Sequence, residues 1–420
     1  MAATEHETLP QVTAEAAPQA PNVVVMKFGG TSVADSAKIK EVAARIVAAR
    51  EGGNRVVAVL SAMGHTTDDL VRLAHEVSTR PKPRELDMLI SVGERISCAL
   101  AAMAIHDLGH DAISLTGSQA GIVTDNVHGK AKIVDVRARR IHEALGQEKI
   151  VLVAGFQGVS TDLDITTLGR GGSDTTAVAL AAAIGATHCE IYTDVAGVFT
   201  ADPRIVPGAR KLHVVSYDEM LELSASGAKV LQLRSVEVAR NYGVKLHVRS
   251  TFSPDEGTWV TEEDDRMLEK AIISGVAHTF DEAVYRVESG DRAELFATLA
   301  DGAINVDTII QVGGDEIVFS APLPDQLETE TALERVGASW ERYDGLAKIS
   351  LIGAGMKSHP GIAARTFAVL GDLDAQAQFI VTSPIKISFY VDGADAERTV
   401  VALHEAFDLS SADAERTSTG

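Results

Sequence analysis

The sequence predicts an α/β protein with a mainly parallel sheet sandwiched by helices, followed by two smaller α+β, ferredoxin-like units. Over residues 23–260, apolar runs rich in β-branched residues alternate with Ala- and Leu-rich helical patterns, which is typical of parallel strands joined by helices. Residues 261–266 include four acidic side chains and indicate an exposed linker. Beyond it the chain repeats, since Ala293–Leu299 matches Ala364–Leu370 and two predicted strands follow each copy, at 305–311 and 316–320 and then at 376–381 and 385–391.

Length, composition and charge exclude several classes of protein. The 420 residues suffice for two or three domains, and 45% of them are hydrophobic, as in globular proteins. The net charge of −21 argues against nucleic acid or an anionic membrane as a partner, because both attract basic surfaces. Cys98 and Cys189 lie in apolar patterns without metal-ligand spacing, so we expect buried thiols in a reducing cytoplasm.

The two ends are expected to be disordered tails, over residues 1–22 and 411–420. No Lys or Arg precedes Lys27, whereas signal and transit peptides need early basic residues. No apolar run approaches the ~20 residues of a membrane span. We therefore expect a cytoplasmic protein without a membrane segment.

The first predicted strand, at 23–26, leads into Lys27-Phe28-Gly29-Gly30 and then into a helix at 36–50. Paired glycines let the backbone approach phosphate oxygens, and free N–H groups at a helix start point toward them. Lys27 would add a mobile positive charge for a phosphoryl group in transfer. An ordinary strand-to-helix turn is the alternative interpretation.

A second glycine-rich loop, at 166–176, precedes an Ala-rich helix at 177–184. Arg170 lies between its glycines, and a guanidinium binds carboxylate or phosphate in a bidentate fork. Asp174 is placed to orient a lysine, to hold a metal or to cap the helix. Two anion-binding loops, each with its own cation, indicate a small-molecule kinase, and the P-loop pattern is absent from the sequence.

The remaining strands of this region are predicted at 56–60, 112–115, 150–154, 189–193 and 245–248. In α/β proteins ligands bind at the carboxyl ends of parallel strands. Both glycine-rich loops follow such ends, so we expect them to border one site.

Six motifs resemble those of the aspartate kinase family and occur in that family's order. They are Lys27–Val33, Ser91–Arg95, Gly155–Gly158, Thr167–Thr176, Tyr192–Arg204 and Gly227–Leu231. The resemblance covers about residues 23 to 250 and implies the amino-acid kinase fold. It also implies that the γ-phosphoryl group of ATP passes to the β-carboxylate of L-aspartate, giving 4-phospho-L-aspartate, the first step of the aspartate-family amino-acid pathway. Mg²⁺ would accompany ATP to offset the repulsion between two anions, and no protein side chain is expected as a metal ligand.

The resemblance also assigns roles to individual residues. The catalytic residues would be Lys27, Asp174 and Arg170. L-Aspartate would contact Ser61, Thr67, Glu94, Phe156, Arg170, Gly171, Gly172 and Ser173, with Arg170 on a carboxylate and Glu94 on the ammonium group. ATP would contact Lys27, Phe28, Gly29, Gly30, Thr193, Asp194, Phe199, Arg204 and Lys229. Two alternatives stay open, namely a helix salt bridge of Glu94 to Arg95 or Arg84, and a plain surface role for Lys229.

The repeat beyond the linker resembles a pair of ACT domains, and the second copy carries the loop Gly353–Gly361. In aspartate kinases one unit is usually inserted within the other. We therefore expect residues 270–280 to join 346–410, with 281–345 inserted and 261–269 as the linker. A lysine or threonine effector would bind at the ACT interface near Asp307, Gln311, Met356, His359, Pro360, Gly361 and Ser383. Pairing of ACT units from two chains would give a homo-oligomer.

The repeat departs from the family pattern at two places. Val287–Arg292 lacks the Asp-x-Pro-Gly pattern of the first regulatory loop, and Pro384 replaces a common glutamate. Altered or weakened feedback by lysine or threonine is one interpretation, and drift without consequence is the other.

Two other functions remain open from the sequence. One is a related kinase with another acyl or carboxylate acceptor, and the other is a non-catalytic ACT regulatory protein. The complete set of Lys27, Glu94, Arg170 and Asp174 favours an active aspartate kinase, because a decayed enzyme would be expected to lose part of it.

Overall fold

An eight-stranded sheet forms the centre of the first part of the chain. The computed structural model describes residues 22–262, 273–354, 356, 359 and 361–410. The strand order is β10-β12-β11-β9-β1-β2-β6-β3, and every neighbouring pair is parallel except β11 and β12. The bounds are β1 Val23–Phe28, β2 Arg55–Leu60, β3 Ala112–Leu115, β6 Ile150–Ala154, β9 His188–Thr193, β10 Val214–Ser216, β11 Leu246–Ser250 and β12 Thr258–Thr261. The predicted mainly parallel sheet is confirmed.

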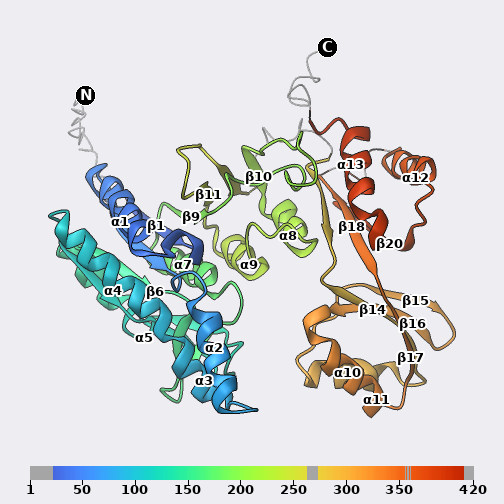
Figure 1. Cartoon of the computed structure of the whole chain (residues 1–420), viewed down its shortest axis with the longest axis horizontal. Helices are drawn as coiled ribbons and strands as arrows, with labels where there is room; N and C mark the ends of the chain where they lie inside the picture. Colours follow the sequence, from blue (N-terminus) through green and yellow to red (C-terminus); the bar gives the residue numbers. More distant parts are fainter. Residues whose placement is uncertain (1–21, 263–272, 355, 357–358, 360, 411–420) are drawn as a thin grey trace, which may run out of the picture.

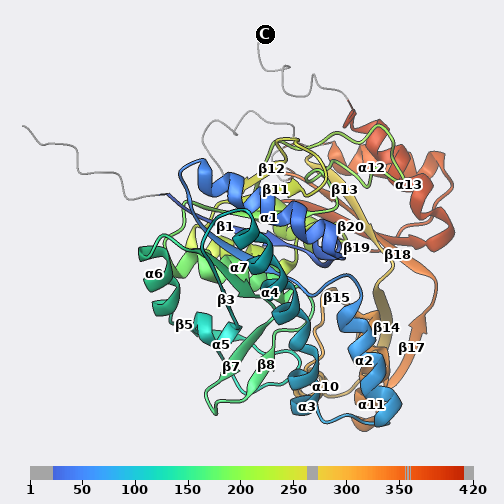
Figure 2. The same cartoon turned by 60° about the vertical axis from the view of Figure 1, so that its left-hand side comes forward.

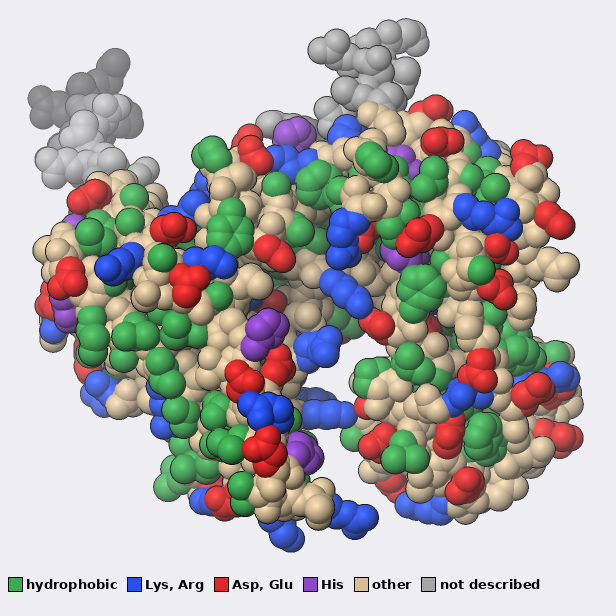
Figure 3. All heavy atoms as spheres, viewed as in Figure 1, with side chains coloured by type: hydrophobic (Ala, Val, Ile, Leu, Met, Phe, Trp, Pro, Cys, Tyr) green, Lys and Arg blue, Asp and Glu red, His purple; other side chains and the backbone are tan. Residues whose placement is uncertain are grey.

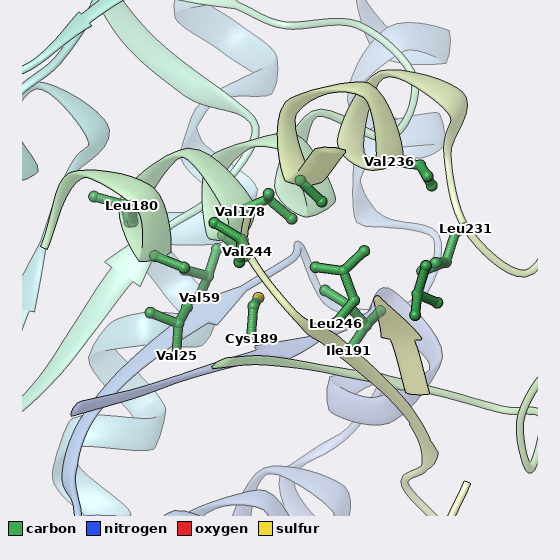
Figure 4. Close-up of a cluster of buried hydrophobic side chains, with 14 of the residues drawn as sticks. Val25, Val59, Val178, Leu180, Cys189, Ile191, Leu231, Val236, Val244 and Leu246 are labelled. Carbon is green, nitrogen blue, oxygen red and sulfur yellow. The ribbon is translucent and has the colours of Figure 1, made fainter. Parts of the chain in front are cut away.

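Helices cover both faces of this sheet (Figures 1 and 2). On one face α1 (Ser36–Glu51) and α4 (Val92–Asp107) lie side by side and pack on Val24, Met26 and Phe28 of β1. On the other face, α6 (Arg139–Gly146), α7 (Gly172–Ala183), α8 (Tyr217–Ala225) and α9 (Leu233–Tyr242) pack on Val25 and its neighbours. Figure 4 shows Val25 and Val59 of the sheet together with Val178 and Leu180 of α7. Because side chains alternate between faces along a strand, a nearly continuous apolar run fills both cores.

A smaller four-stranded sheet and short helices complete this part. The small sheet has the order β5-β4-β7-β8, with β4 Ile122–Thr124, β5 Ile133–Val136, β7 Gln157–Ser160 and β8 Ile165–Thr167. The helices are η1 Gly30–Val33, α2 Thr66–Val77, α3 Pro83–Ile90 and α5 Gly117–Ala120. The predicted start of α7 at Ala177 is wrong, since the helix begins at Gly172. Its polar first turns are stable although buried because their side chains bond locally, as Thr176 Oγ1 does to Gly172 O at 2.8 Å.

One helical stretch among the described residues, Pro83–Asp107, is long and apolar enough to cross a membrane by length and composition alone. This stretch contains the charged residues Glu94 and Arg95 and is therefore not an uninterrupted apolar run. Half of its most apolar window is buried inside the protein, and α4 packs against α1 and the sheet. A core helix of a globular protein has these properties as well.

Two further four-stranded sheets follow, drawn at the right of Figure 1. One has the order β13-β18-β20-β19, with bounds Gly275–Thr279, Leu346–Ile352, Lys386–Asp392 and Gln378–Ser383. The other has the order β15-β16-β14-β17, with bounds Ile309–Gly313, Glu316–Pro322, Glu282–Glu288 and Ser339–Tyr343. Their helices are α10 Arg292–Asp301, α11 Gln326–Arg335, α12 Ile362–Asp372 and α13 Ala396–Ala406, with the short η3 Leu323–Asp325 and η4 Gly393–Asp395.

The pairing of β13 with β18 supports a division into nested units. We propose that 270–280 and 346–410 form one unit and that 281–345 are inserted between them. Two boundary details differ from the sequence-based expectation. β12 includes Thr261, the first residue of the expected linker, while 263–269 lie outside the described residues. β15 begins at Ile309 and not at 305, because only isolated backbone bonds to Ser320 hold the residues before it.

Candidate active site

An ion pair joins the two glycine-rich loops. Lys27 Nζ, near the end of β1, lies 2.6 Å from Asp174 Oδ1 in the first turn of α7. The two side chains are only 12% and 10% exposed, so solvent screens the pair weakly. A Cβ built on Gly29 would lie 3.5 Å from Lys27 Nζ. The ammonium group of Lys27 therefore lies beside the backbone of Gly29, where one anion can contact both groups.

The loop after β1 lies close to the loop after β2. A Cβ on Gly30 would lie 3.1 Å from the carbonyl oxygen of Ala62, so glycine permits this approach. Ser61 on this second loop and Thr67 in the first turn of α2 are partly buried, and Ser97 Oγ donates a 2.6 Å hydrogen bond to Ser61 O. The parallel register of β1 and β2 thus brings these expected contacts to the same edge of the sheet.

Glu94 is a buried carboxylate with one oxygen unused. The residue is 3% exposed, and its Oε1 accepts a 3.3 Å bond from the backbone N–H of Ala62. Its Oε2 has no hydrogen-bond partner among the residues that the structure describes. Arg84 and Arg95, the alternative partners, bond to other side chains. A buried acceptor without a donor is costly, which favours a ligand that supplies one.

Burial also changes the titration of this carboxyl group. Desolvation raises the pKa of Glu94 to about 7, against smaller lowering effects of backbone hydrogen bonds and the charge of Arg95. Below that pH the side chain is neutral, and above it the carboxylate can bind a cation such as an ammonium group.

We predict that this titration appears in the pH dependence of activity. The value of kcat/KM for an amino-acid substrate should rise as the pH increases through 7, because the anionic form binds its ammonium group. Glu94→Gln should remove that rise and raise the KM of this substrate about tenfold, with little effect on the nucleotide KM. Glu85→Gln, an exposed change on α3, is the control. An equal loss of affinity for nucleotide would place Glu94 outside the substrate pocket.

The second glycine-rich loop packs tightly against the end of β6. A Cβ on Gly155 would lie 2.8 Å from Ser173 Oγ, and one on Gly172 would lie 2.9 Å from Phe156 Cδ2. Phe156 adopts a φ of 66°, an unusual backbone conformation for a bulky residue that is typical of functional sites. Arg170 is exposed, and no ion pair engages it within the described part of the chain. Its guanidinium is therefore available to an incoming anion.

Four of the expected nucleotide residues border a cavity of about 560 Å³, which suits a small molecule, whereas Lys27, Phe28, Gly29 and Gly30 do not line it. Asp194, Phe199, Arg204 and Lys229 line one side, and β13 together with Asp281 lines the other. The remaining nucleotide candidate on this side, Thr193, donates a 3.0 Å bond to Asp194 Oδ1.

Both cations of this cavity are paired with carboxylates. Arg204 Nη2 lies 2.6 Å from Asp202 Oδ2, and Lys229 Nζ lies 2.6 Å from Asp281 Oδ2. The lysine was also open to interpretation as a surface residue, and its side chain is 71% exposed. Sequence reasoning missed Asp281 because it comes from the segment that joins β13 to β14, far along the chain. Binding of a phosphate at Lys229 would compete with this carboxylate.

Positive charge gathers near the opening between the two parts of the molecule. Figure 3 shows Lys and Arg side chains along the gap between the first part and the lower right unit. The chain as a whole has a net charge of −21. Such a local concentration of cations favours anionic small molecules over a polyanion, which would meet repulsion elsewhere.

The expected effector residues lie on the second part of the chain. Asp307 and Gln311 flank the start of β15, and Ser383 ends β19. Met356 is buried in the core beneath α12, whereas His359 and Gly361 are exposed. Pro360 lies outside the described residues.

Comparison with known proteins points in one direction. Residues 22–250 match the amino acid kinase family model, and residues 349–407 match an ACT domain model. An aspartokinase from Mycolicibacterium smegmatis is 51% identical over 409 residues, which cover 93% of this chain and 97% of that protein. The aspartokinase of Corynebacterium glutamicum is 49% identical over 409 residues, with the same coverage of both chains, 93% and 97%.

Two solved structures have the same architecture. E. coli aspartokinase III in complex with aspartate and ADP, an R-state structure, aligns with a TM-score of 0.81 and 26% identity over 91% of this chain and 99% of that chain. The T-state of the same enzyme, in complex with lysine and aspartate, aligns with a TM-score of 0.71 and 27% identity over 92% and 99%.

Proposed function

The chain belongs to the amino acid kinase family and, within it, to the aspartokinases, and we propose that it phosphorylates the β-carboxylate of L-aspartate with ATP. The observation that carries this proposal is the buried carboxylate of Glu94 with its unused Oε2. An ammonium group is the natural partner of such an oxygen. Arg170 supplies the complementary cation for a carboxylate, so the pair fits an amino acid, and the similarity to aspartokinases points to aspartate as that amino acid.

The substrate is held by groups of opposite charge. Arg170 binds one carboxylate in a fork, Ser173 donates a hydrogen bond to it, and Glu94 accepts from the ammonium group. Ser61, Thr67, Phe156, Gly171 and Gly172 complete the contacts. The β-carboxylate oxygen then attacks the γ-phosphorus as the bond to the ADP oxygen breaks, which requires the two anions to be held in line.

Lys27 stabilises the charge that develops on the transferring group. Asp174 holds its ammonium in place at 2.6 Å, and Gly29 and Gly30 line the phosphate path. The side chain of Phe28, the other expected nucleotide contact here, is instead buried in the core. Fixed charges of this kind need no reorganisation at the moment of reaction. On the other side, Thr193, Asp194, Phe199, Arg204 and Lys229 bind the nucleotide.

Mg²⁺ would be bound mainly through the phosphates of ATP. Within the described ranges, no group of three or more His, Cys, Asp or Glu side chains is placed to hold a metal ion. When bound, the ion would neutralise phosphate charge and so lessen the repulsion between ATP and aspartate.

Release of ADP tests this function. With ATP and Mg²⁺, ADP should form when L-aspartate is present, and far more slowly with L-glutamate, acetate or carbamate. Preference for one of the other acceptors would favour a related kinase. The absence of turnover with every acceptor would favour a non-catalytic regulatory protein.

We propose that feedback inhibition by lysine or threonine is weak in this enzyme. Asp307, one expected effector ligand, already pairs with Lys348, whose side chain is 1% exposed and also lies 2.9 Å from Glu282 Oε1. Burial lowers the pKa of Lys348, but the neighbouring carboxylates outweigh it and keep that pKa above its usual value. Lys348 therefore stays charged and occupies the carboxylate that an effector ammonium would need.

We predict weak or absent inhibition by lysine, with residual threonine binding. The lost glutamate at Pro384 and the lost turn at Val287–Arg292 leave few partners for an ammonium group. Initial rates at sub-saturating aspartate should be measured with lysine and threonine, singly and together. Strong concerted inhibition below about 1 mM would contradict this prediction.

We also predict a homo-oligomer formed through these units. β15 and β19 are edge strands with exposed apolar side chains, Ile309, Val312 and Ile380. Open, apolar edges favour pairing with another chain. Light scattering should give a mass above the 44.4 kDa of one chain, and a single species of that mass at micromolar concentration would refute the pairing.

A further inference from the structure

A buried aspartate outside the assigned site lies beneath the second glycine-rich loop. Asp87 on α3 is 1% exposed. Its Oδ1 accepts a 2.5 Å bond from Thr167 Oγ1, and its Oδ2 accepts a 3.1 Å bond from the N–H of Gly129. The ring nitrogen Nδ1 of His128 lies 2.7 Å from the same Oδ2. A carboxylate removed from water but bonded at both oxygens is costly to disturb.

These bonds join three segments that are distant in the sequence. Thr167 is the last residue of β8 and lies at the start of the glycine-rich loop that carries Arg170. Gly129 belongs to the turn between β4 and β5, and a Cβ on Gly169 would lie 3.1 Å from its carbonyl oxygen. The N–H of Ala131 also donates to Thr167 O at 3.0 Å. Asp87 therefore holds the base of the loop against both the turn and α3.

Arg234 is a second anchor, and it holds Leu168, the residue that follows Thr167. Arg234 on α9 donates a 2.8 Å bond to Leu168 O and a 3.1 Å bond to Ala131 O. With both anchors in place, the backbone entering Arg170 is fixed at two consecutive residues, Thr167 and Leu168. Arg170 itself is exposed and makes no comparable bond among the described residues, so its position depends on how Thr167 and Leu168 are held.

The helix that carries Asp87 leads straight into the helix that carries Glu94. Only Ser91 separates α3 from α4, and Gln157 Nε2 donates a 2.7 Å bond to Ser91 O, which fixes the break against the small sheet. Two adjoining helices thus carry the carboxylate for the substrate ammonium, on α4, and the anchor of the loop that binds the substrate carboxylate, on α3.

We propose that Asp87 is a positioning residue that sets the spacing between Glu94 and Arg170, acting through Thr167. This inference rests on the proposed function and extends it, since the spacing determines whether one amino acid can contact both groups at the same time. Loss of the hydrogen bond between Thr167 and Asp87 should weaken binding of the acidic substrate. Nucleotide binding should be retained. A displacement of about 1 Å in such a contact is enough to cost up to 10²-fold in efficiency.

The test compares two neighbouring buried threonines. Thr167→Val removes the hydroxyl bonded to Asp87, whereas Thr166→Val removes an equally buried hydroxyl that bonds to Thr124 Oγ1 at 2.7 Å. Thr167→Val should raise the aspartate KM about tenfold or more with an unchanged ATP KM. Thr166→Val should leave the ratio of the two KM values at its parental level, and Thr167→Ser should restore it. Melting temperatures of the variants report any general loss of stability.

The possible outcomes separate the inference from the function on which it rests. Equal effects of the two valine variants, or equal losses for aspartate and ATP, would overturn the positioning role while the unmodified enzyme remained active with aspartate. No aspartate-dependent activity in the unmodified enzyme would overturn the proposed function and this inference with it.

Discussion

Replacing Lys27 with alanine is expected to lower kcat by about 10²-fold or more. The ammonium group lies 2.6 Å from Asp174, and the Lys27 side chain is 12% exposed, so its charge is fixed and weakly screened where the phosphoryl group passes. Because the interaction is strongest in the transition state, kcat should fall more than substrate binding weakens. Steady-state rates at saturating ATP and aspartate measure the effect.

Lys40→Ala provides the matched control for this change. Lys40 is an exposed lysine on α1, and its loss should leave kcat within about twofold, as for a surface substitution. Near-parental kcat in the Lys27 variant would mean that another cation stabilises the transition state.

Replacing Arg170 with alanine is expected to lower kcat/KM for aspartate by about 10²-fold or more, mainly through a higher KM. The guanidinium is exposed and lacks an ionic partner among the described residues, so its binding energy is available to the substrate. Arg170→Lys should recover only part of the loss, because an ammonium cannot form the bidentate fork. Initial rates over a range of aspartate concentrations separate KM from kcat.

Arg139→Ala controls for the loss of one positive charge. Arg139 lies on α6 with its side chain 80% exposed, so its removal should not change the aspartate KM. An Arg170→Ala enzyme with parental kcat/KM would remove this residue from the substrate site.

Local patterns were enough to predict the sheet and the loops around the site. Lys27 lies near the end of β1, and Ser61 and Asp194 directly follow β2 and β9. These strands have strong apolar signals, and parallel pairing brings their carboxyl ends together. The boundaries of α7 and β15 were less accurate. A helix start rich in polar residues resembles a loop until its hydroxyls are seen to bond within the helix.

Unlike the pair of Lys27 with Asp174, three other carboxylate contacts could not be predicted from local patterns. Asp281 beside Lys229, Asp307 beside Lys348, and Asp87 beneath the loop all come from segments distant in the sequence. Nothing in the residues around each aspartate identifies its partner. Only the folded arrangement places these charges together, and it also decides that Glu94 is buried and bonds to the backbone of Ala62.

Trapping with hydroxylamine tests most directly whether the β-carboxylate of aspartate receives the phosphoryl group. The enzyme is incubated with ATP, Mg²⁺, L-aspartate and hydroxylamine, and ADP and aspartyl hydroxamate are quantified together. One β-hydroxamate should form for each ADP, and none in the Lys27→Ala enzyme on the same time scale. ADP release without β-hydroxamate, or hydroxamate at the α-carboxylate, would contradict the proposed reaction.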